Sequence, residues 1–156
     1  MPNSEAVEIL LVEDNPSDAV LAMHALEKSK LANKVCVVSD GEEALDYLLC
    51  RGNYSDRPLQ TAPSLVLLDL KLPKVDGMEV LRELKSNPRT RSIPVVILTA
   101  SKEERDLVQS YKLGANSYIQ KPVSFSEFQE VVQQLGMYWL LLNSRPPVAA
   151  FSESSD

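Results

Sequence analysis

The chain has 156 residues, of which 44% are hydrophobic and 24% charged, and its 22 acidic and 16 basic side chains give a formal net charge of −6. A chain of this length forms one full hydrophobic core but not two, so we expect a single domain. The acidic balance excludes general binding to nucleic acid or anionic membranes, because both partners require a concentrated basic surface.

Cysteine content and apolar runs indicate the compartment. Cys36 and Cys50 are too few for a disulfide framework and lack the spacing of a zinc site. The N-terminal segment has no basic region followed by an apolar stretch, and no apolar run approaches the ~20 residues of a membrane helix. We therefore expect a cytoplasmic protein that does not enter a membrane.

Short apolar runs rich in β-branched residues alternate with longer amphipathic segments along the chain. This alternation predicts parallel strands joined by helical crossovers. In chain order, the predicted elements are strand 7–12, helix 17–29, strand 35–39, helix 42–50, strand 65–69, helix 77–86, strand 94–99, helix 102–113, strand 117–119 and helix 124–143. The first, third and fourth strands are almost continuously apolar, which is typical of strands covered on both faces, whereas the second and fifth suit sheet edges.

Local signals support three helix boundaries. Ser101 and Glu104 have the spacing of a capping box, and Gly114 stands where a glycine commonly ends a helix. Asn87 precedes a proline, a position that disfavours helical backbone, so we expect the helix at 77–86 to end there.

Two segments are longer than an alternation of strands and helices with short loops requires. The polar connection over residues 50–64 is longer than most loops, and we interpret it as an insertion in preference to a functional excursion. The last helix, with ~20 residues, is also long, and after Leu135 it is apolar around its whole circumference, so something must cover it. We therefore predict a single domain over 1–145 and a C-terminal tail over 146–156.

Acidic, hydroxyl-bearing and basic residues lie where four of the predicted strands end. The first strand runs into Glu13 and Asp14, the third ends in Asp69, the fourth ends in Thr99, and the fifth is followed by Lys121. Parallel strands have their carboxyl ends at one edge, where open α/β sheets bind ligands. Taken singly, these residues could be an acidic helix start, a strand threonine and a solvated lysine. Their joint placement predicts a site.

Three converging carboxylates repel one another, so they must bind a cation or take up a proton. Oxygen ligands without histidine or cysteine favour Mg²⁺. A cation would allow Asp69 to act as a nucleophile toward phosphorus, because the metal neutralises charge on the phosphoryl oxygens. Lys121 and Thr99 would then contact that phosphoryl group.

The sequence closely resembles the receiver domain of bacterial response regulators over roughly residues 6–135. The matching segments are Leu11-Val12-Glu13-Asp14, Leu68-Asp69-Leu70, Pro73 with Asp76-Gly77, Leu98-Thr99-Ala100, and Tyr118 with Lys121-Pro122. Their agreement in type and order makes the resemblance specific. It implies an α/β, doubly wound, flavodoxin-like sheet of five parallel strands in the order 2-1-3-4-5, here with an extended C-terminal helix.

The resemblance also implies the roles of individual residues. Asp69 would be the phosphoacceptor, and the Mg²⁺ ligands would be Glu13, Asp14, Asp69 and the backbone carbonyl of Lys71. Thr99, Ala100 and Lys121 would contact the phosphoryl group, and Thr99 and Tyr118 would move on switching. A histidine kinase would supply the phosphoryl group to a protein that is not an enzyme but dephosphorylates itself slowly.

A narrower resemblance concerns the insertion and the aromatic segment Met137-Tyr138-Trp139-Leu140. Both are similar to small single-domain regulators paired with cyanobacterial phytochrome histidine kinases. Too few residues follow Pro122 for a DNA-binding output domain, so we expect a stand-alone receiver. We predict a homodimer through the face from the fourth to the fifth helix and the C-terminal tail, with a tail folded over its own domain as the alternative.

Two other functions must be weighed. An aspartate-based, Mg²⁺-dependent phosphohydrolase also uses a strand-end aspartate, but it usually needs a second acid two residues later, where this chain has Lys71. A flavin-binding domain of the same topology needs a phosphate-binding loop after the first strand, where Glu13 and Asp14 would repel phosphate.

We expect the charge of Lys71 to alter the lifetime of an aspartyl phosphate.

Overall fold

The computed structural model describes residues 8–29, 34–57, 62–100, 104–121, 124, 126–127 and 130. Its strands are β1 (Glu8–Val12), β2 (Lys34–Val38), β3 (Leu65–Asp69), β4 (Val95–Thr99) and β5 (Ser117–Gln120). Its helices are α1 (Pro16–Ser29), α2 (Gly41–Leu49), the short 3-10 helix η2 (Gly52–Tyr54), α3 (Gly77–Ser86) and α4 (Glu104–Leu113). No helix within these ranges is long and apolar enough to cross a membrane.

The five strands form one parallel sheet in the order β2-β1-β3-β4-β5, which confirms the predicted topology. The predicted edge strands are indeed the outer two. The register pairs Val12 with Leu68, Asp69 with Leu98, and Thr99 with Gln120. The carboxyl ends of four neighbouring strands therefore lie side by side, as the site prediction requires.

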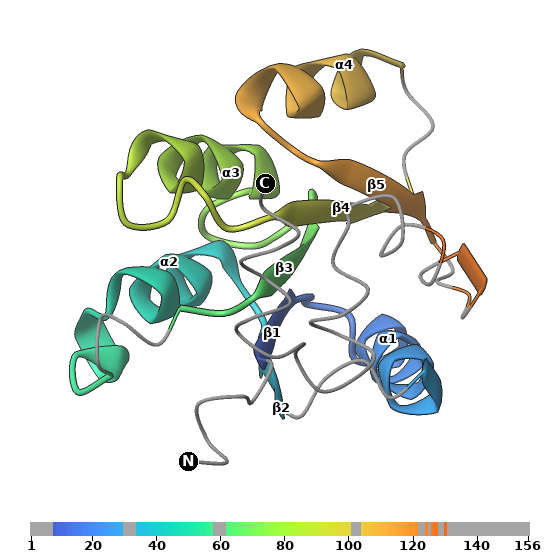
Figure 1. Cartoon of the computed structure of the whole chain (residues 1–156), viewed down its shortest axis with the longest axis horizontal. Helices are drawn as coiled ribbons and strands as arrows, with labels where there is room; N and C mark the ends of the chain where they lie inside the picture. The colour runs from blue at the N-terminus through green and yellow to red at the C-terminus, as the bar shows by residue number, and fades with distance from the viewer. Residues whose placement is uncertain are drawn as a thin grey trace, which may run out of the picture.

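Helices cover both faces of the sheet. Figure 1 shows α2, α3 and α4 along one face and α1 on the other. Alternate residues of a strand point to opposite faces, so Leu10 and Val12 join the core beneath α2 and α3, whereas Ile9 and Leu11 join the core beneath α1. Of the three inner strands, β3 and β4 are buried along their whole length and β1 at every residue except Glu8, which explains their continuous apolar runs.

The observed helix and strand limits differ from the predicted ones by at most two residues, and local chemistry explains the clearest differences. Helix α1 begins at Pro16, one residue earlier than predicted, because proline suits the first helical position, and Asn15 Oδ1 accepts a hydrogen bond from the Asp18 N–H at 3.0 Å. Cys50 does not extend α2 but caps it with a left-handed backbone, φ 55°. Helix α3 matches the prediction and ends before Asn87.

Several predicted features lie outside the described residues. They include Ser101 of the proposed capping box, nearly all of the helix predicted at 124–143 and the tail at 146–156. At the predicted start of that helix, Ser124 Oγ accepts a hydrogen bond from the Glu127 N–H at 3.2 Å, which is an N-cap contact. Gly114 ends α4 with φ 110°, as expected.

The described part of the 50–64 segment is folded against α2. Tyr54 donates a hydrogen bond to Glu43 Oε2 at 2.7 Å, and its ring meets Tyr47 edge-on at 5.0 Å. The Arg57 guanidinium lies 3.8 Å from the centre of the Tyr47 ring. These contacts join the described part of the segment to α2, and its interpretation as an insertion stays a prediction.

Gly77 lets the start of α3 approach the end of β3. A Cβ atom at this position would lie 2.3 Å from the Asp69 carbonyl oxygen and 2.6 Å from Leu70 Cα, both of which are backbone atoms. The Gly77 N–H also donates to the Leu70 carbonyl at 2.9 Å. The position of the β3–α3 loop therefore requires a residue without a side chain at position 77.

We predict that Gly77→Ala lowers the free energy of unfolding by roughly 2–3 kcal/mol, because backbone must move to admit the methyl group. Gly52→Ala is the matched control, since its methyl group would meet the rotatable Asp46 carboxylate and the left-handed backbone would cost about 1 kcal/mol. Urea unfolding of both variants measures the difference. Equal losses would contradict this account of Gly77.

Candidate functional site

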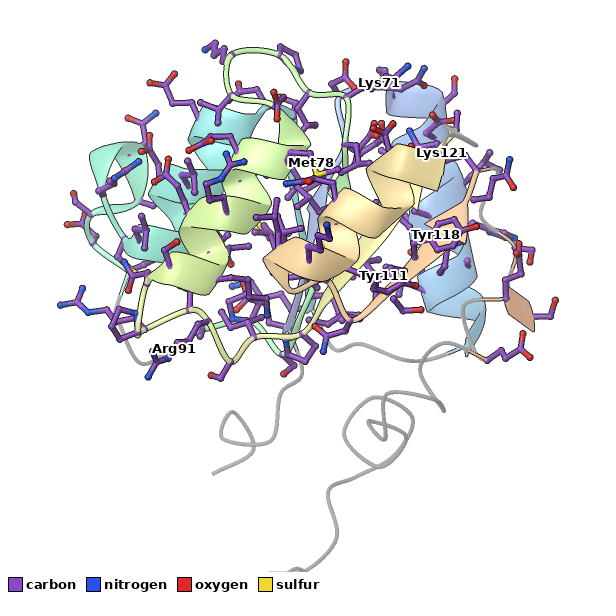
Figure 2. The ribbon with its side chains drawn as sticks, turned by 90° about the horizontal axis from the view of Figure 1, so that it is seen from above. Lys71, Met78, Arg91, Tyr111, Tyr118 and Lys121 are labelled. Carbon is purple, nitrogen blue, oxygen red and sulfur yellow. The ribbon has the colours of Figure 1, made fainter. Side chains whose placement is uncertain are left out.

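The sheet places the predicted residues at one edge. Glu13 follows β1, Asp69 is the last residue of β3, Thr99 is the last residue of β4, and Lys121 follows β5. Figure 2 shows Lys71 and Lys121 at the same end of the molecule, with Lys121 beside the first turn of α1. The structure thus brings together the residues that the sequence placed at strand ends.

A polar cavity of about 390 Å³ opens at this edge. It is lined by Asp14, Asn15, Pro16, Asp18, Asp69, Lys71, Thr99, Ala100 and Lys121. A neighbouring hollow of about 510 Å³ shares Asp14 and Lys71, but Leu70, Leu72, Pro73 and Met78 make much of its wall apolar. The first cavity is the better place for charged chemistry.

Three carboxylates form the acidic part of the site. One oxygen each from Glu13, Asp14 and Asp69 can lie within 4.8 Å of the other two. The Glu13 and Asp69 side chains are 1% and 7% exposed, whereas Asp14 is exposed to solvent. Three hard oxygen donors, one of them open to water, suit a small divalent cation that keeps part of its hydration shell.

The ammonium of Lys121 lies among carboxylates from three different elements. Its Nζ is 2.7 Å from Glu13 Oε1, 2.8 Å from Asp18 Oδ2 and 3.0 Å from Asp69 Oδ2, and the side chain is only 12% exposed. Burial alone would lower the pKa of Lys121, but its interactions with the carboxylates of Asp18, Glu13 and Asp69 outweigh burial and raise the pKa above its usual range. Lys121 therefore stays charged and offsets part of the carboxylate repulsion.

Glu13 behaves differently from an exposed glutamate. Burial raises its pKa to about 7, although hydrogen bonds from Lys121 and from the Asn15 N–H, 3.1 Å from Oε2, act in the opposite direction. The nearby charge of Asp69 raises the pKa further. Near neutral pH, this carboxylate can thus release a proton when a cation arrives.

Both oxygens of Asp69 are oriented by neighbouring donors. The Lys71 N–H donates to Oδ1 at 3.2 Å, and Lys121 donates to Oδ2 at 3.0 Å. Thr99 is buried beside them at the end of β4, and Ala100 is exposed at the mouth of the cavity. A carboxylate held in this way has a fixed direction toward an incoming electrophile.

Tyr118 does not line the cavity. It pairs with Ile97 in the sheet and packs, partly buried, against the core beneath α2 and α3, at a distance from Lys121 along β5 in Figure 2. Thr99 is two residues beyond Ile97 and so points to the same face of the sheet. The two predicted switch residues therefore share one face.

Asp18 belongs to the site although its sequence context did not single it out. It lies in the first turn of α1 and contacts Lys121, which is 103 positions away in the chain. The only local signal is that the helix follows β1 directly, so its first turn must start at the carboxyl edge. His24, the single histidine, lies on the exposed face of α1 and carries no part of the site.

Comparison with protein families and curated proteins identifies relatives. The model of the response regulator receiver domain matches residues 9–133. The probable methanogenesis regulatory protein FilR2 of Methanothrix harundinacea is 44% identical over 138 residues, which are 88% of this chain and 86% of FilR2. The response regulator Rcp1 of Synechocystis sp. is 41% identical over 132 residues, 85% of this chain and 88% of Rcp1.

Solved structures agree with this result. The bacteriophytochrome response regulator RtBRR superposes with a TM-score of 0.80 and 51% identity, covering 91% of this chain and 85% of RtBRR. The Mn(2+)-bound form of Rcp1 has a TM-score of 0.73 and 39% identity, over 90% and 99% of the two chains. The phosphorylated cyanobacterial phytochrome response regulator RcpA has a TM-score of 0.73 and 42% identity, over 91% and 99%.

We predict that divalent cation binding depends on pH through Glu13. Because its pKa is raised, protonation of the Glu13 carboxyl stabilises the metal-free fold. This contribution to stability is fully present below pH 4.5, the usual pKa of the group, and is lost as the pH rises through about 7. A cation needs the carboxylate, so its affinity should rise about tenfold per pH unit up to 7 and then level off. Calorimetric titration with Mg²⁺ at several pH values measures this curve.

Glu13→Gln supplies the comparison for that titration. The amide cannot lose a proton, so the remaining, weaker binding should vary little near pH 7. A wild-type affinity that is already constant from about pH 5.5 upward would contradict the raised pKa of Glu13.

Proposed function

The chain belongs to the response regulator receiver family, and on this basis we propose that Asp69 accepts a phosphoryl group from a histidine kinase and that the modified domain changes its partner-binding surface. The observation that carries the proposal is the Asp69 carboxylate, oriented by the Lys71 N–H and by Lys121 within a group of three acids. The members of this family named above are regulators and not enzymes.

In the transfer step, an Asp69 carboxylate oxygen attacks the phosphorus of a phosphohistidine. The new O–P bond forms while the P–N bond breaks, and its electrons return to the imidazole nitrogen. Lys121 then donates to a phosphoryl oxygen in place of Asp69 Oδ2, while buried Thr99 offers its hydroxyl and Ala100 its backbone N–H. The contribution of these groups is positioning and charge stabilisation.

We assign Glu13, Asp14, Asp69 and the backbone carbonyl of Lys71 as the residues that would hold Mg²⁺. The hard oxygen set and the exposed Asp14 support this cation, and the relative Rcp1 has been solved with Mn(2+) bound. When bound, the cation neutralises charge on the phosphoryl oxygens and holds them in line with the nucleophile.

Switching starts from the buried hydroxyl of Thr99. We propose that Thr99 moves toward the phosphoryl group and that Tyr118, on the same face of the sheet, turns into the space behind it. This motion would alter the surface formed by α4, β5 and the following helix. The change is a population shift between two packings, biased by a local charge.

The phosphohydrolase alternative finds less support. A general acid two residues after the nucleophile would be needed to protonate a leaving alcohol, and that position is the exposed Lys71. A receiver instead keeps its aspartyl phosphate and hydrolyses it slowly. We propose slow self-dephosphorylation for this chain, with a rate influenced by the charge of Lys71.

We propose that the donor is a phytochrome-type histidine kinase. The support is the similarity to regulators described as bacteriophytochrome or cyanobacterial phytochrome response regulators. The formal net charge of −6 disfavours nucleic acid as a partner, and we propose that the output passes through protein contacts. We also propose that the protein works in the cytoplasm, where the ATP that charges histidine kinases is found.

We further propose a homodimer through the face from α4 to the following helix and the C-terminal tail. Tyr111 on α4 is among the large apolar side chains that are exposed on the described part of the surface. The aromatic segment around Trp139 and the leucines that follow it supply further apolar surface in the sequence. A second copy would remove this surface from water.

The central prediction concerns the phosphoacceptor. Incubation with acetyl phosphate and Mg²⁺ should add one phosphoryl group to the wild-type chain and none to Asp69→Asn, because the amide is not a nucleophile toward phosphorus. Intact-mass measurement checks both. No gain in either protein, or a gain in both, would refute the assignment of Asp69. Repeated turnover of phosphomonoesters would instead support the phosphohydrolase.

The dimer is tested by light scattering. Wild-type protein should have twice the mass of one chain, and Trp139→Glu should shift it toward the monomer, because a charge at a buried apolar seam is costly. Val20→Glu is the control, since Val20 is exposed on α1 and outside the proposed face. A wild-type monomer, both with and without acetyl phosphate, would exclude the dimer.

A further inference from the structure

Asp18 is the one carboxylate of the site to which the phosphorylation chemistry assigns no role. It lies outside the group of three acids whose oxygens converge as cation ligands. Its Oδ2 nevertheless lies 2.8 Å from Lys121 Nζ, closer than Asp69 Oδ2 at 3.0 Å. An exposed ion pair would carry little meaning, but Lys121 is 12% exposed and Asp18 only 31% exposed.

Two of the three contacts of Lys121 are hydrogen bonds, and the third is an ion pair. Its Nζ donates to Asp18 Oδ2 at 2.8 Å and to Asp69 Oδ2 at 3.0 Å, and Glu13 Oε1 lies 2.7 Å away as an ion-pair partner. Two of these acceptors come from strand ends and one from a helix. The ammonium is therefore held from three directions, and each contact limits its movement toward the other two.

The position of Asp18 is itself fixed locally. Its backbone N–H donates to Asn15 Oδ1 at 3.0 Å, and the Ala19 N–H donates to the Asn15 carbonyl at 2.9 Å. These contacts set the first turn of α1 directly behind β1. The Asp18 carboxylate thus reaches the cavity from α1, and it is not one of the three acids whose oxygens converge.

We propose that Asp18 is a positioning residue. It keeps the Lys121 ammonium where it can contact a phosphoryl group on Asp69, and it prevents the ammonium from moving into the space between Glu13 and Asp69. This inference rests on the proposed function of Asp69. When Asp69 carries the phosphoryl group, a phosphoryl oxygen replaces Asp69 Oδ2 as one acceptor. Asp18 retains its hydrogen bond and Glu13 its ion pair with Lys121, so the ammonium need not be repositioned.

The first experiment separates the reaction rate from cation binding. Phosphorylation by acetyl phosphate is followed over a range of Mg²⁺ concentrations in wild type, Asp18→Asn, Asp18→Glu and Glu27→Gln. Glu27 is an exposed acid on the same helix and serves as the matched control. Because Asp18 is not a cation ligand, Asp18→Asn should lower the saturating rate about five- to tenfold, with the half-saturating Mg²⁺ concentration within about twofold of wild type.

The rates of the conservative variant and of the control test whether the effect depends on a carboxylate at position 18. Asp18→Glu should recover part of the lost rate, since it restores a carboxylate on α1, and Glu27→Gln should match wild type. An unchanged saturating rate in Asp18→Asn would overturn the proposal. A faster rate would also overturn it, because it would mean that the Asp18 charge chiefly repels the phosphoryl donor.

The second experiment needs neither metal nor phosphoryl group. Metal-free protein is treated briefly with an amine-acylating reagent, and the labelling of Lys121 relative to exposed Lys71 is measured by peptide mass spectrometry. Loss of one charge-assisted hydrogen bond should make Lys121 in Asp18→Asn react at least about threefold faster, with no change in Glu27→Gln. Equal labelling in Asp18→Asn and wild type would show that Asp18 does not hold the ammonium and would overturn the proposal.

The two measurements distinguish this inference from the function on which it rests. If wild-type protein accepts no phosphoryl group, the proposed function fails, and a role for Asp18 in phosphorylation fails with it, whatever the labelling shows. If wild type is phosphorylated normally but Asp18→Asn differs in neither rate nor labelling, only the role of Asp18 is refuted.

Discussion

Repulsion among the carboxylates at the carboxyl edge of the sheet is the constraint on which the site depends. Glu13 and Asp69 are almost fully buried, and buried negative charges are costly unless a cation or a proton compensates them. Lys121 supplies one positive charge, and burial makes Glu13 ready to hold a proton near neutral pH. The same imbalance makes the cavity suited to a divalent cation, and hence to chemistry on a phosphoryl group.

The backbone around this edge is shaped to hold the charges in place. The β3–α3 loop turns back so closely that Gly77 touches the Asp69 carbonyl, and the Lys71 N–H meets the Asp69 side chain. The same loop is supported from α2, where the Gly41 N–H donates to the Pro73 carbonyl at 3.3 Å. Close packing of loops gives the carboxylate a fixed direction, which a solvated loop would not provide.

The segment after α2 leaves this arrangement intact. It contains a short 3-10 helix and contributes Tyr54 and Arg57 to an aromatic and cationic cluster around Tyr47 of α2, and its described residues do not line the cavity. Surface segments of this kind can vary at little thermodynamic cost. A change in this segment is therefore expected to leave the geometry of the cavity unaltered.

The sequence pattern by itself determined the parallel sheet and grouped most of the site residues, and the resemblance to receiver domains supplied the strand order. Apolar runs of strand length separated by helical segments require a parallel sheet, and a parallel sheet places every strand end at one edge, so Glu13, Asp69, Thr99 and Lys121 could be grouped without coordinates. Helix limits were predicted to within one or two residues, because the start of α1 at Pro16 and the cap of α2 at Cys50 depend on local backbone geometry.

Only the tertiary structure decided which charges meet. The contact between Asp18 and Lys121 joins residues 103 positions apart, and no local pattern specifies the direction in which the first turn of α1 points. The raised pKa of Glu13 likewise results from burial beneath neighbouring elements. Chain order specifies which residues reach an edge, but distances and desolvation, on which electrostatic energies depend, exist only once the elements have packed.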